Sequence, residues 1–179
     1  MKYVYFFEEG SKEQKNLLGG KGSNLCEMTN LGLPVPKGFV ISTQACIDFF
    51  ESNEFPENLE EQIDVALNSL EEKTGKKFNS SNPLLVSVRS GARISMPGMM
   101  DTVLNLGLNE KTINAMTEKT QNKRFVLDSY RRFLQMFANV VLNLEHNKFE
   151  EILEREKKSA EIKLDCDLTE TSLEKIIKE

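Results

Sequence analysis

Two arginines lie in a stretch that joins strand-like segments to a glycine-containing loop. Arg89 and Arg93 fall between apolar residues 84–88 and 103–106, and the connecting loop also holds two glycines, a proline, three methionines and an aspartate. Arginine is always charged and presents a planar fork of donors, and glycines let backbone N–H groups approach a ligand closely, so this loop suits a phosphate group. The alternative is an ordinary β-hairpin whose arginines pair with surface carboxylates.

A second candidate anion site consists of three glycines around one lysine, Gly19-Gly20-Lys21-Gly22. Apolar residues at helical spacing follow it, and Gly32 is placed to end that helix in the left-handed conformation. The glycines therefore lead into a helix N-terminus, where free N–H groups and the helix dipole favour anions. This is not a Walker A loop, because Lys15 stands at the motif's first glycine and Gly22 at its Ser or Thr. The alternative is that the glycines only form a turn.

Composition narrows the classes of protein. The chain has 179 residues, 39% of them hydrophobic, which is enough for a globular core. No segment approaches the ~18 apolar residues of a membrane span, and acidic residues come too early for a signal peptide, so we expect a cytoplasmic protein. Three scattered cysteines and one histidine predict reduced thiols, without a disulfide framework or a zinc site.

The net charge of -5 is concentrated in the last part of the chain. Residues 145–179 carry eleven acidic and seven basic side chains, which leaves the first 144 residues nearly neutral. Such a chain offers no broad cationic surface for nucleic acid. Any anion site must therefore be local.

The pattern of elements predicts an α+β fold. Strands are expected near residues 3–7 and 39–41. Helices are expected from Thr43, as the N-cap, to Phe50 and from residue 59 to about Gly75. From residue 109 onward only helical spacing is found: one long helix with an aromatic stripe over 125–141, then two shorter helices, the second with Thr169 as its N-cap. The last pattern still runs at Glu179, which predicts that the natural protein continues.

Within the long helix, Arg131 and Arg132 are adjacent. Neighbouring residues of a helix point about 100° apart, so both cannot face one ligand squarely. We expect one to line a cleft and the other to be solvated.

These motifs resemble a known family. Gly19–Leu25 followed by Gly32–Val40 resembles the opening of pyruvate phosphate dikinase and of its relative phosphoenolpyruvate synthase. Ser87–Arg93 with Ser95–Gly107 is similar to the dikinase specifically, and Ser129–Phe133 also matches its pattern. The resemblance covers essentially the whole chain.

The resemblance implies an ATP-grasp-like α/β subdomain over residues 1–108, a small sheet with helices, followed by an all-helical subdomain over 109–179. Enzymes of this family convert ATP, phosphate and pyruvate to AMP, pyrophosphate and phosphoenolpyruvate through a phosphohistidine on a separate domain. The Mg²⁺ ligands, the catalytic histidine and the pyruvate site are all expected outside this chain. The chain alone is therefore expected to be inactive, and the full-length enzyme to be a cytoplasmic homodimer.

By matching positions, the resemblance also implies which residues contact ATP. Lys21, Arg89 and Arg132 look like the family's phosphate-contacting cations, and Arg93 is a further contact. The segment from residue 98 to residue 102 looks like its polyphosphate loop; the residues expected to contribute are Gly98, Met100, Asp101 and Thr102. No metal ligand and no catalytic residue is expected in the chain, and His146 matches no phosphohistidine motif.

Two other functions remain open at this stage. One is a water dikinase of the phosphoenolpyruvate synthase type, which differs downstream of these residues. The other belongs to another class: a stand-alone, non-catalytic interaction domain in which the glycine and arginine loops serve no ligand.

Overall fold

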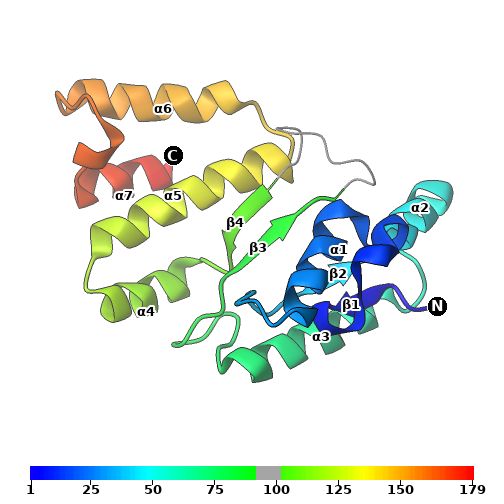
Figure 1. Cartoon of the computed structure of the whole chain (residues 1–179). Coiled ribbons are helices and arrows are strands. Elements are labelled where there is room, and N and C mark those ends of the chain that lie inside the picture. The colour runs from blue at the N-terminus through cyan, green and yellow to red at the C-terminus, as the bar shows by residue number, and fades with distance from the viewer. Residues whose placement is uncertain (92–101) are drawn as a thin grey trace. The chain divides into compact units, whose positions relative to one another are not determined.

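The computed structural model describes residues 1–91 and 102–179, which form a mixed α/β fold (Figure 1). This confirms the predicted fold class. The described residues group into two compact units, one made of residues 1–75 with 90–91, the other of residues 76–89 with 102–179. Each unit has its own sheet and its own apolar core, so each is described by itself.

The first unit is built on two short antiparallel strands, in which Tyr5 lies opposite Val40. Three helices pack around them, and the buried core is formed by Tyr3, Val4, Ala45, Leu59 and Ala66. The predicted strand at residues 39–41 is confirmed, and the first strand is shorter than predicted. The elements are β1 (Val4–Phe6), the 3-10 turns η1 (Phe7–Glu9) and η2 (Lys12–Gln14), α1 (Lys15–Asn30), β2 (Phe39–Ile41), α2 (Thr43–Ser52) and α3 (Leu59–Thr74).

The helix ends of this unit follow from local chemistry. Gly32 and Gly75 adopt φ values of +74° and +64° after α1 and α3, which confirms both predicted helix ends. The predicted N-cap at Thr43 is wrong by one residue. The Ser42 hydroxyl accepts from the Ala45 N–H at 3.4 Å, whereas the Thr43 hydroxyl donates to the Asn16 carbonyl at 2.6 Å.

The second unit contains the predicted hairpin strands and the helical part of the chain. Arg89 pairs with Thr102 and Val86 with Leu106, with a register shift between Val86 and Val88. The elements are β3 (Val86–Arg89), β4 (Thr102–Leu106), α4 (Glu110–Thr120), α5 (Lys123–Val140), α6 (His146–Ser159), the 3-10 turn η3 (Asp165–Asp167) and α7 (Glu170–Lys178). The Thr169 hydroxyl accepts from the Ser172 N–H at 3.1 Å, which confirms the predicted cap of α7.

Helix α5 is the centre of the second unit. Its residue Phe133 packs with Val103 and Leu108 in a cluster that includes the hairpin. Its residue Leu127 packs in a second cluster with Leu153 of α6, Leu173 of α7 and Leu168, which directly follows η3. Of the stripe predicted over 125–141, the middle part lies in the cluster with the hairpin, whereas Phe125 and Val141 are more than half exposed.

This grouping bears on how the chain is divided in space. The strands β3 and β4 pack with α5, so they belong to the same compact unit as the helices after residue 109. The division into subdomains over residues 1–108 and 109–179 stays a prediction. Among residues 1–91 and 102–179, no helix is long and apolar enough to cross a membrane.

Gly107 ends the hairpin in a conformation that favours glycine, and its replacement gives a first testable prediction. Its φ is +115°, and an added Cβ would lie 2.5 Å from the Leu84 carbonyl oxygen. We expect Gly107→Ala to lower the free energy of unfolding by about 2 kcal/mol, because it adds backbone strain and a clash with main-chain atoms. Urea unfolding of the 179-residue chain measures this loss.

The control is Gly75→Ala. Gly75 also has positive φ, +64°, but nothing lies within 4 Å of an added Cβ. This variant carries strain without a clash and is expected to cost about 1 kcal/mol. Equal losses in the two variants would show that the contact with the Leu84 carbonyl contributes nothing.

Candidate phosphate-binding site

Lys21 lies near the start of a helical segment. Helix α1 is interrupted at Gly19, whose φ of 68° and ψ of 170° are not helical, and helical geometry resumes at Gly20. The predicted glycine loop is therefore shorter than expected, since Gly20 to Gly22 are already helical. Lys21 belongs to the first turn after the break, where main-chain N–H groups have no partner within the helix.

Gly22 serves packing. A Cβ at this position would lie 2.9 Å from Cγ1 and 3.1 Å from Cγ2 of Val40. A glycine therefore allows α1 to approach strand β2 closely. Gly22 thus has a packing role within a helix, which differs from the turn considered from the sequence.

An open pocket of about 320 Å³ surrounds Lys21 in the first unit. It is lined by Lys12, Glu13, Lys15, Gly20, Lys21, Ser23 and Asn24. Three lysines face one carboxylate there, so the local charge is positive and favours an anion. Among these lysines, only Lys21 was predicted from the sequence. Lys12 and Lys15 are three residues apart just before the glycines, which is the signal that could have found them.

Arg89 ends strand β3 and is exposed. Its main chain pairs with Thr102 of β4. Within residues 1–91 and 102–179 its side chain makes no hydrogen bond or ion pair. The guanidinium is therefore available for a ligand.

Thr102 begins β4 and is half-buried. The other predicted loop contacts, Arg93, Gly98, Met100 and Asp101, lie outside the described residues.

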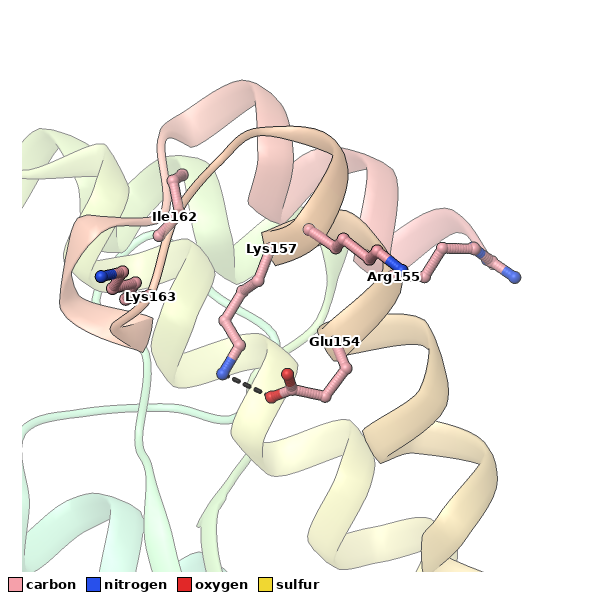
Figure 2. A pocket seen from close by; sticks show the side chains of 6 residues that line it. Glu154, Arg155, Lys157, Ile162 and Lys163 are labelled. Carbon is pink, nitrogen blue, oxygen red and sulfur yellow. Dashed lines mark ion pairs between the residues drawn. The ribbon is translucent and has the colours of Figure 1, made fainter.

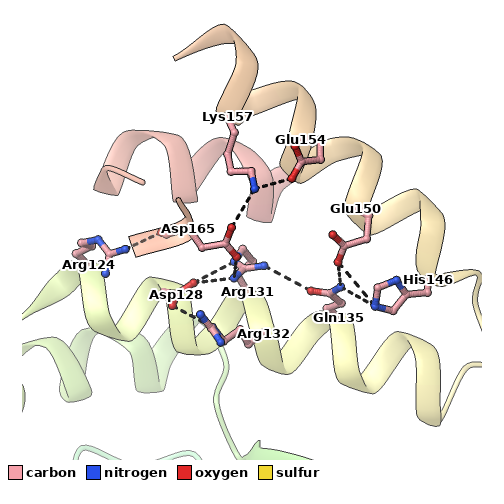
Figure 3. A network of polar contacts seen from close by, with 10 residues as sticks. All are labelled: Arg124, Asp128, Arg131, Arg132, Gln135, His146, Glu150, Glu154, Lys157 and Asp165. Carbon is pink, nitrogen blue, oxygen red and sulfur yellow. Dashed lines mark hydrogen bonds and ion pairs between the residues drawn. The ribbon is translucent and has the colours of Figure 1, made fainter. Parts of the chain in front are cut away.

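The two adjacent arginines of α5 have different surroundings (Figure 3). The Arg131 side chain is 7% exposed and that of Arg132 is 58% exposed. Arg131 donates from Nη2 to Oδ1 of Asp128 at 2.9 Å and to Oδ2 of Asp165 at 3.4 Å. Arg132 donates from Nε to Oδ2 of Asp128 at 3.0 Å. Arg131 is thus a structural residue, and Arg132 is the one that a ligand can reach.

Further ion pairs link Asp165 to α6 and extend the contacts of Arg131 into a network of charged side chains. Asp165 Oδ1 accepts from Lys157 Nζ at 3.2 Å, and Glu154 Oε1 lies 2.5 Å from the same nitrogen. These two carboxylates raise the pKa of the Lys157 ammonium above its ordinary value, with the Glu154 hydrogen bond as the larger cause. Arg124 donates to the main-chain carbonyls of Leu168 and Asp165 at 2.8 and 2.9 Å. The network joins α5, α6 and η3.

A larger pocket, of about 650 Å³, lies at the end of α6 and has basic residues around it (Figure 2). Its lining residues are Glu154, Arg155, Lys157, Lys158, Ile162 and Lys163. Lys157 is neutralised by Glu154 and Asp165, and Arg155 pairs with Glu179. The C-terminal end of a helix also carries partial negative charge, which disfavours anions. We therefore do not regard this pocket as a phosphate site.

The candidate residues divide between the two units. Arg89, Thr102 and Arg132 belong to the second unit, in which β4 packs against α5. Lys21 and its pocket belong to the first unit.

His146 is exposed, and its Nε2 lies 3.3 Å from Nε2 of Gln135 and 3.7 Å from Oε1 of Glu150. Among the described residues, no three His, Cys, Asp or Glu side chains are grouped so that they could hold a metal ion.

Comparison with protein families gives a match over most of the chain. The matching family model is described as the pyruvate phosphate dikinase, AMP/ATP-binding domain, and it covers residues 15–54 and 47–128. The matched region includes Lys21 and Arg89 and ends before Arg132.

Several curated proteins similar to this chain carry the same name. The chain is 50% identical over 177 residues to pyruvate, phosphate dikinase of Clostridium symbiosum, and 49% identical over 178 residues to that of Entamoeba histolytica. It is 50% identical over 182 residues to that of Rickettsia felis. Each alignment covers 98% of this chain but only 20 to 21% of the relative. The chain thus spans about a fifth of the length of these relatives.

Proposed function

This chain belongs to the family of the pyruvate phosphate dikinase AMP/ATP-binding domain, and from this premise we propose that it forms one wall of the ATP site of a pyruvate phosphate dikinase. The observation that carries the proposal is the 50% identity to the Clostridium symbiosum dikinase over 98% of the chain. The full-length protein converts ATP, phosphate and pyruvate to AMP, pyrophosphate and phosphoenolpyruvate. The chain by itself does not catalyse this reaction.

The proposed role of the chain is to hold and neutralise the polyphosphate of ATP. Phosphoryl transfer depends mainly on positioning and on stabilising negative charge, so a protein contributes clustered cations and main-chain N–H groups. Lys21, in its cationic pocket, and the two exposed arginines, Arg89 and Arg132, are the described residues suited to this role. Each of these three cations is proposed to contact a phosphate of ATP.

The remaining parts of the proposal rest on family membership alone. A loop contacts the polyphosphate of ATP through Gly98, Met100, Asp101 and Thr102. Arg93 is a further contact. Magnesium is bound by carboxylates that lie outside this chain. The full-length enzyme is a cytoplasmic homodimer with an ATP-grasp-like nucleotide domain.

Titration of the isolated chain with Mg-ATP tests the binding role. We expect dissociation constants no tighter than about 100 μM, because the chain supplies only part of the site and its cations remain exposed to water, where charge interactions are weak. In spectra of the ¹⁵N-labelled chain, the amide signals of residues 20–24 and 89 should shift on titration. Those of residues 173–177 in α7 serve as the internal control and should not move.

A variant separates specific binding from general attraction. Lys21→Ala should reduce the shifts of residues 20–24 at a given Mg-ATP concentration, whereas Lys163→Ala should not. Nanomolar binding would overturn the idea that the chain holds only one side of the site. Shifts that are unchanged in the Lys21 variant would overturn its assignment as a phosphate contact.

A further inference from the structure

We propose that Asp128 is a positioning residue that orients Arg132 toward the ATP phosphates. The inference rests on the proposed function and concerns how one of its cations is held. Asp128 lies one helical turn before Arg132 in α5, and its side chain is 16% exposed. It matches none of the motifs that the sequence reasoning singled out, because its role depends on partners that only the fold reveals.

The two oxygens of the Asp128 carboxylate are divided between two arginines (Figure 3). Oδ1 accepts from Nε of Arg131 at 3.1 Å and from Nη2 of Arg131 at 2.9 Å. Oδ2 accepts from Nε of Arg132 at 3.0 Å. One oxygen is therefore committed to a buried cation, and the other to an exposed one.

Arg131 fixes the carboxylate in place. Its side chain is only 7% exposed, and besides Asp128 it donates to Asp165 at 3.4 Å and to Gln135 at 3.5 Å. An arginine with three side-chain acceptors has little freedom to turn. The Asp128 carboxylate that it binds on one side is held with it.

The contact with Arg132 leaves its ligand-binding atoms free. A guanidinium has five N–H donors, and Asp128 takes only the one at Nε. The four N–H groups at Nη1 and Nη2 form the outer fork that matches two phosphate oxygens. Within the described part of the chain, no other side chain binds Arg132. The aspartate thus limits the rotation of a long side chain and leaves its outer fork for the nucleotide.

This arrangement reduces the conformational entropy that the Arg132 side chain loses when ATP binds. A free arginine side chain samples many rotamers, and it must lose that freedom when it grips a phosphate. An arginine whose Nε is already hydrogen-bonded has lost part of this rotamer freedom before the phosphate binds. Removing Asp128 should therefore weaken ATP binding even though Asp128 touches no ATP atom.

The test is a double-mutant cycle in the full-length protein. Binding of a non-hydrolysable ATP analogue with Mg²⁺ is measured for Asp128→Asn, Arg132→Ala and the combination. We expect Arg132→Ala to weaken binding about twentyfold and Asp128→Asn about fivefold. The double variant should bind no more weakly than Arg132→Ala alone, because the aspartate has nothing left to orient.

A matched control separates positioning from stability. Asp165 also binds Arg131 but does not contact Arg132. Asp165→Asn should lower the thermal midpoint, as Asp128→Asn does, while leaving affinity for the analogue nearly unchanged, because Asp128 and Gln135 still hold Arg131. If Asp128→Asn does not fold, Asp128→Glu replaces it. Its longer side chain keeps the charge but displaces the carboxylate, so the same loss and the same non-additivity are expected.

The outcomes are distinct. Additive losses in the double variant, or an equal loss of affinity in Asp165→Asn, would overturn the positioning role while leaving Arg132 as a phosphate contact. Unchanged affinity in Arg132→Ala would instead remove Arg132 from the proposed ATP site, and with it the inference. A fivefold loss that disappears in the Arg132→Ala background supports the proposal.

Discussion

Replacing Arg89 with alanine in the full-length protein is expected to lower the rate of its ATP-dependent phosphorylation by about a hundredfold, because a cation at the polyphosphate stabilises charge that develops in phosphoryl transfer. Lys21→Ala should cause a similar loss. Both side chains lie at ends of elements, Arg89 at the end of β3 and Lys21 just after the break at Gly19. The measurement is the amount of phosphorylated enzyme formed from radiolabelled ATP with time.

The exchange between pyruvate and phosphoenolpyruvate provides the internal comparison. It uses the separate pyruvate site of the proposed enzyme, so both variants should retain it nearly unchanged. Arg155→Ala removes an exposed arginine from α6 and should leave both partial reactions intact. If Arg89→Ala or Lys21→Ala reduced the two partial reactions equally, these residues would serve folding and the assignment to ATP would be wrong.

Replacing Arg131 with leucine should lower the free energy of unfolding of the chain by about 3 kcal/mol. The change removes a buried cation and leaves the carboxylates of Asp128 and Asp165 close together without it. Breaking a buried ion pair by removing one partner is costly, because the two carboxylates lose the buried cation that they share and keep only Arg132 and Lys157 as partners. Urea unfolding of the 179-residue chain measures the loss.

Arg132→Leu is the control for this second prediction. It makes the same chemical change at the next position of α5, but its side chain is 58% exposed and has one carboxylate partner. Exposed ion pairs contribute little, so the control should lose no more than about 0.5 kcal/mol. Similar losses for the two variants would contradict the structural role of Arg131.

The sequence predicted those elements whose pattern is set locally. Strand β2 follows a segment with two prolines, which cannot continue a helix, and it contains the aromatic and β-branched residues that favour strands. Helix α5 was predicted from its aromatic stripe, and Gly32 from its position after the last apolar residue of α1. In each case, a few neighbouring residues carry the whole signal.

The sequence did not predict features that depend on contacts between residues far apart in the chain. Gly20 and Gly22 have low helical propensity, yet they are helical, and at Gly22 close packing against Val40 of β2 requires a residue without a side chain. The different roles of Arg131 and Arg132 depend partly on Asp165, which is 34 residues away from Arg131. Spacing predicted that the two arginines would differ, but not which one would be buried.

The candidate site was also predicted only in part from the sequence. Lys21, Arg89 and Arg132 were named because their neighbours match a family pattern, and the structure adds the lysines around Lys21 and the carboxylate beside Arg132. These additions come from folding rather than from a motif, since Lys12 and Asp128 are ordinary surface-type residues in the sequence. Their proposed contribution is to set local charge and side-chain direction.

The position of α5 between two apolar clusters limits how the second unit can be dissected. One cluster needs Phe133 of this helix and the other needs Leu127. A truncation that removes the hairpin uncovers one side of α5, and a truncation that removes α6 and α7 uncovers the other. Neither end of the unit can therefore be deleted without placing a hydrophobic surface in water, so a soluble minimal version must retain both.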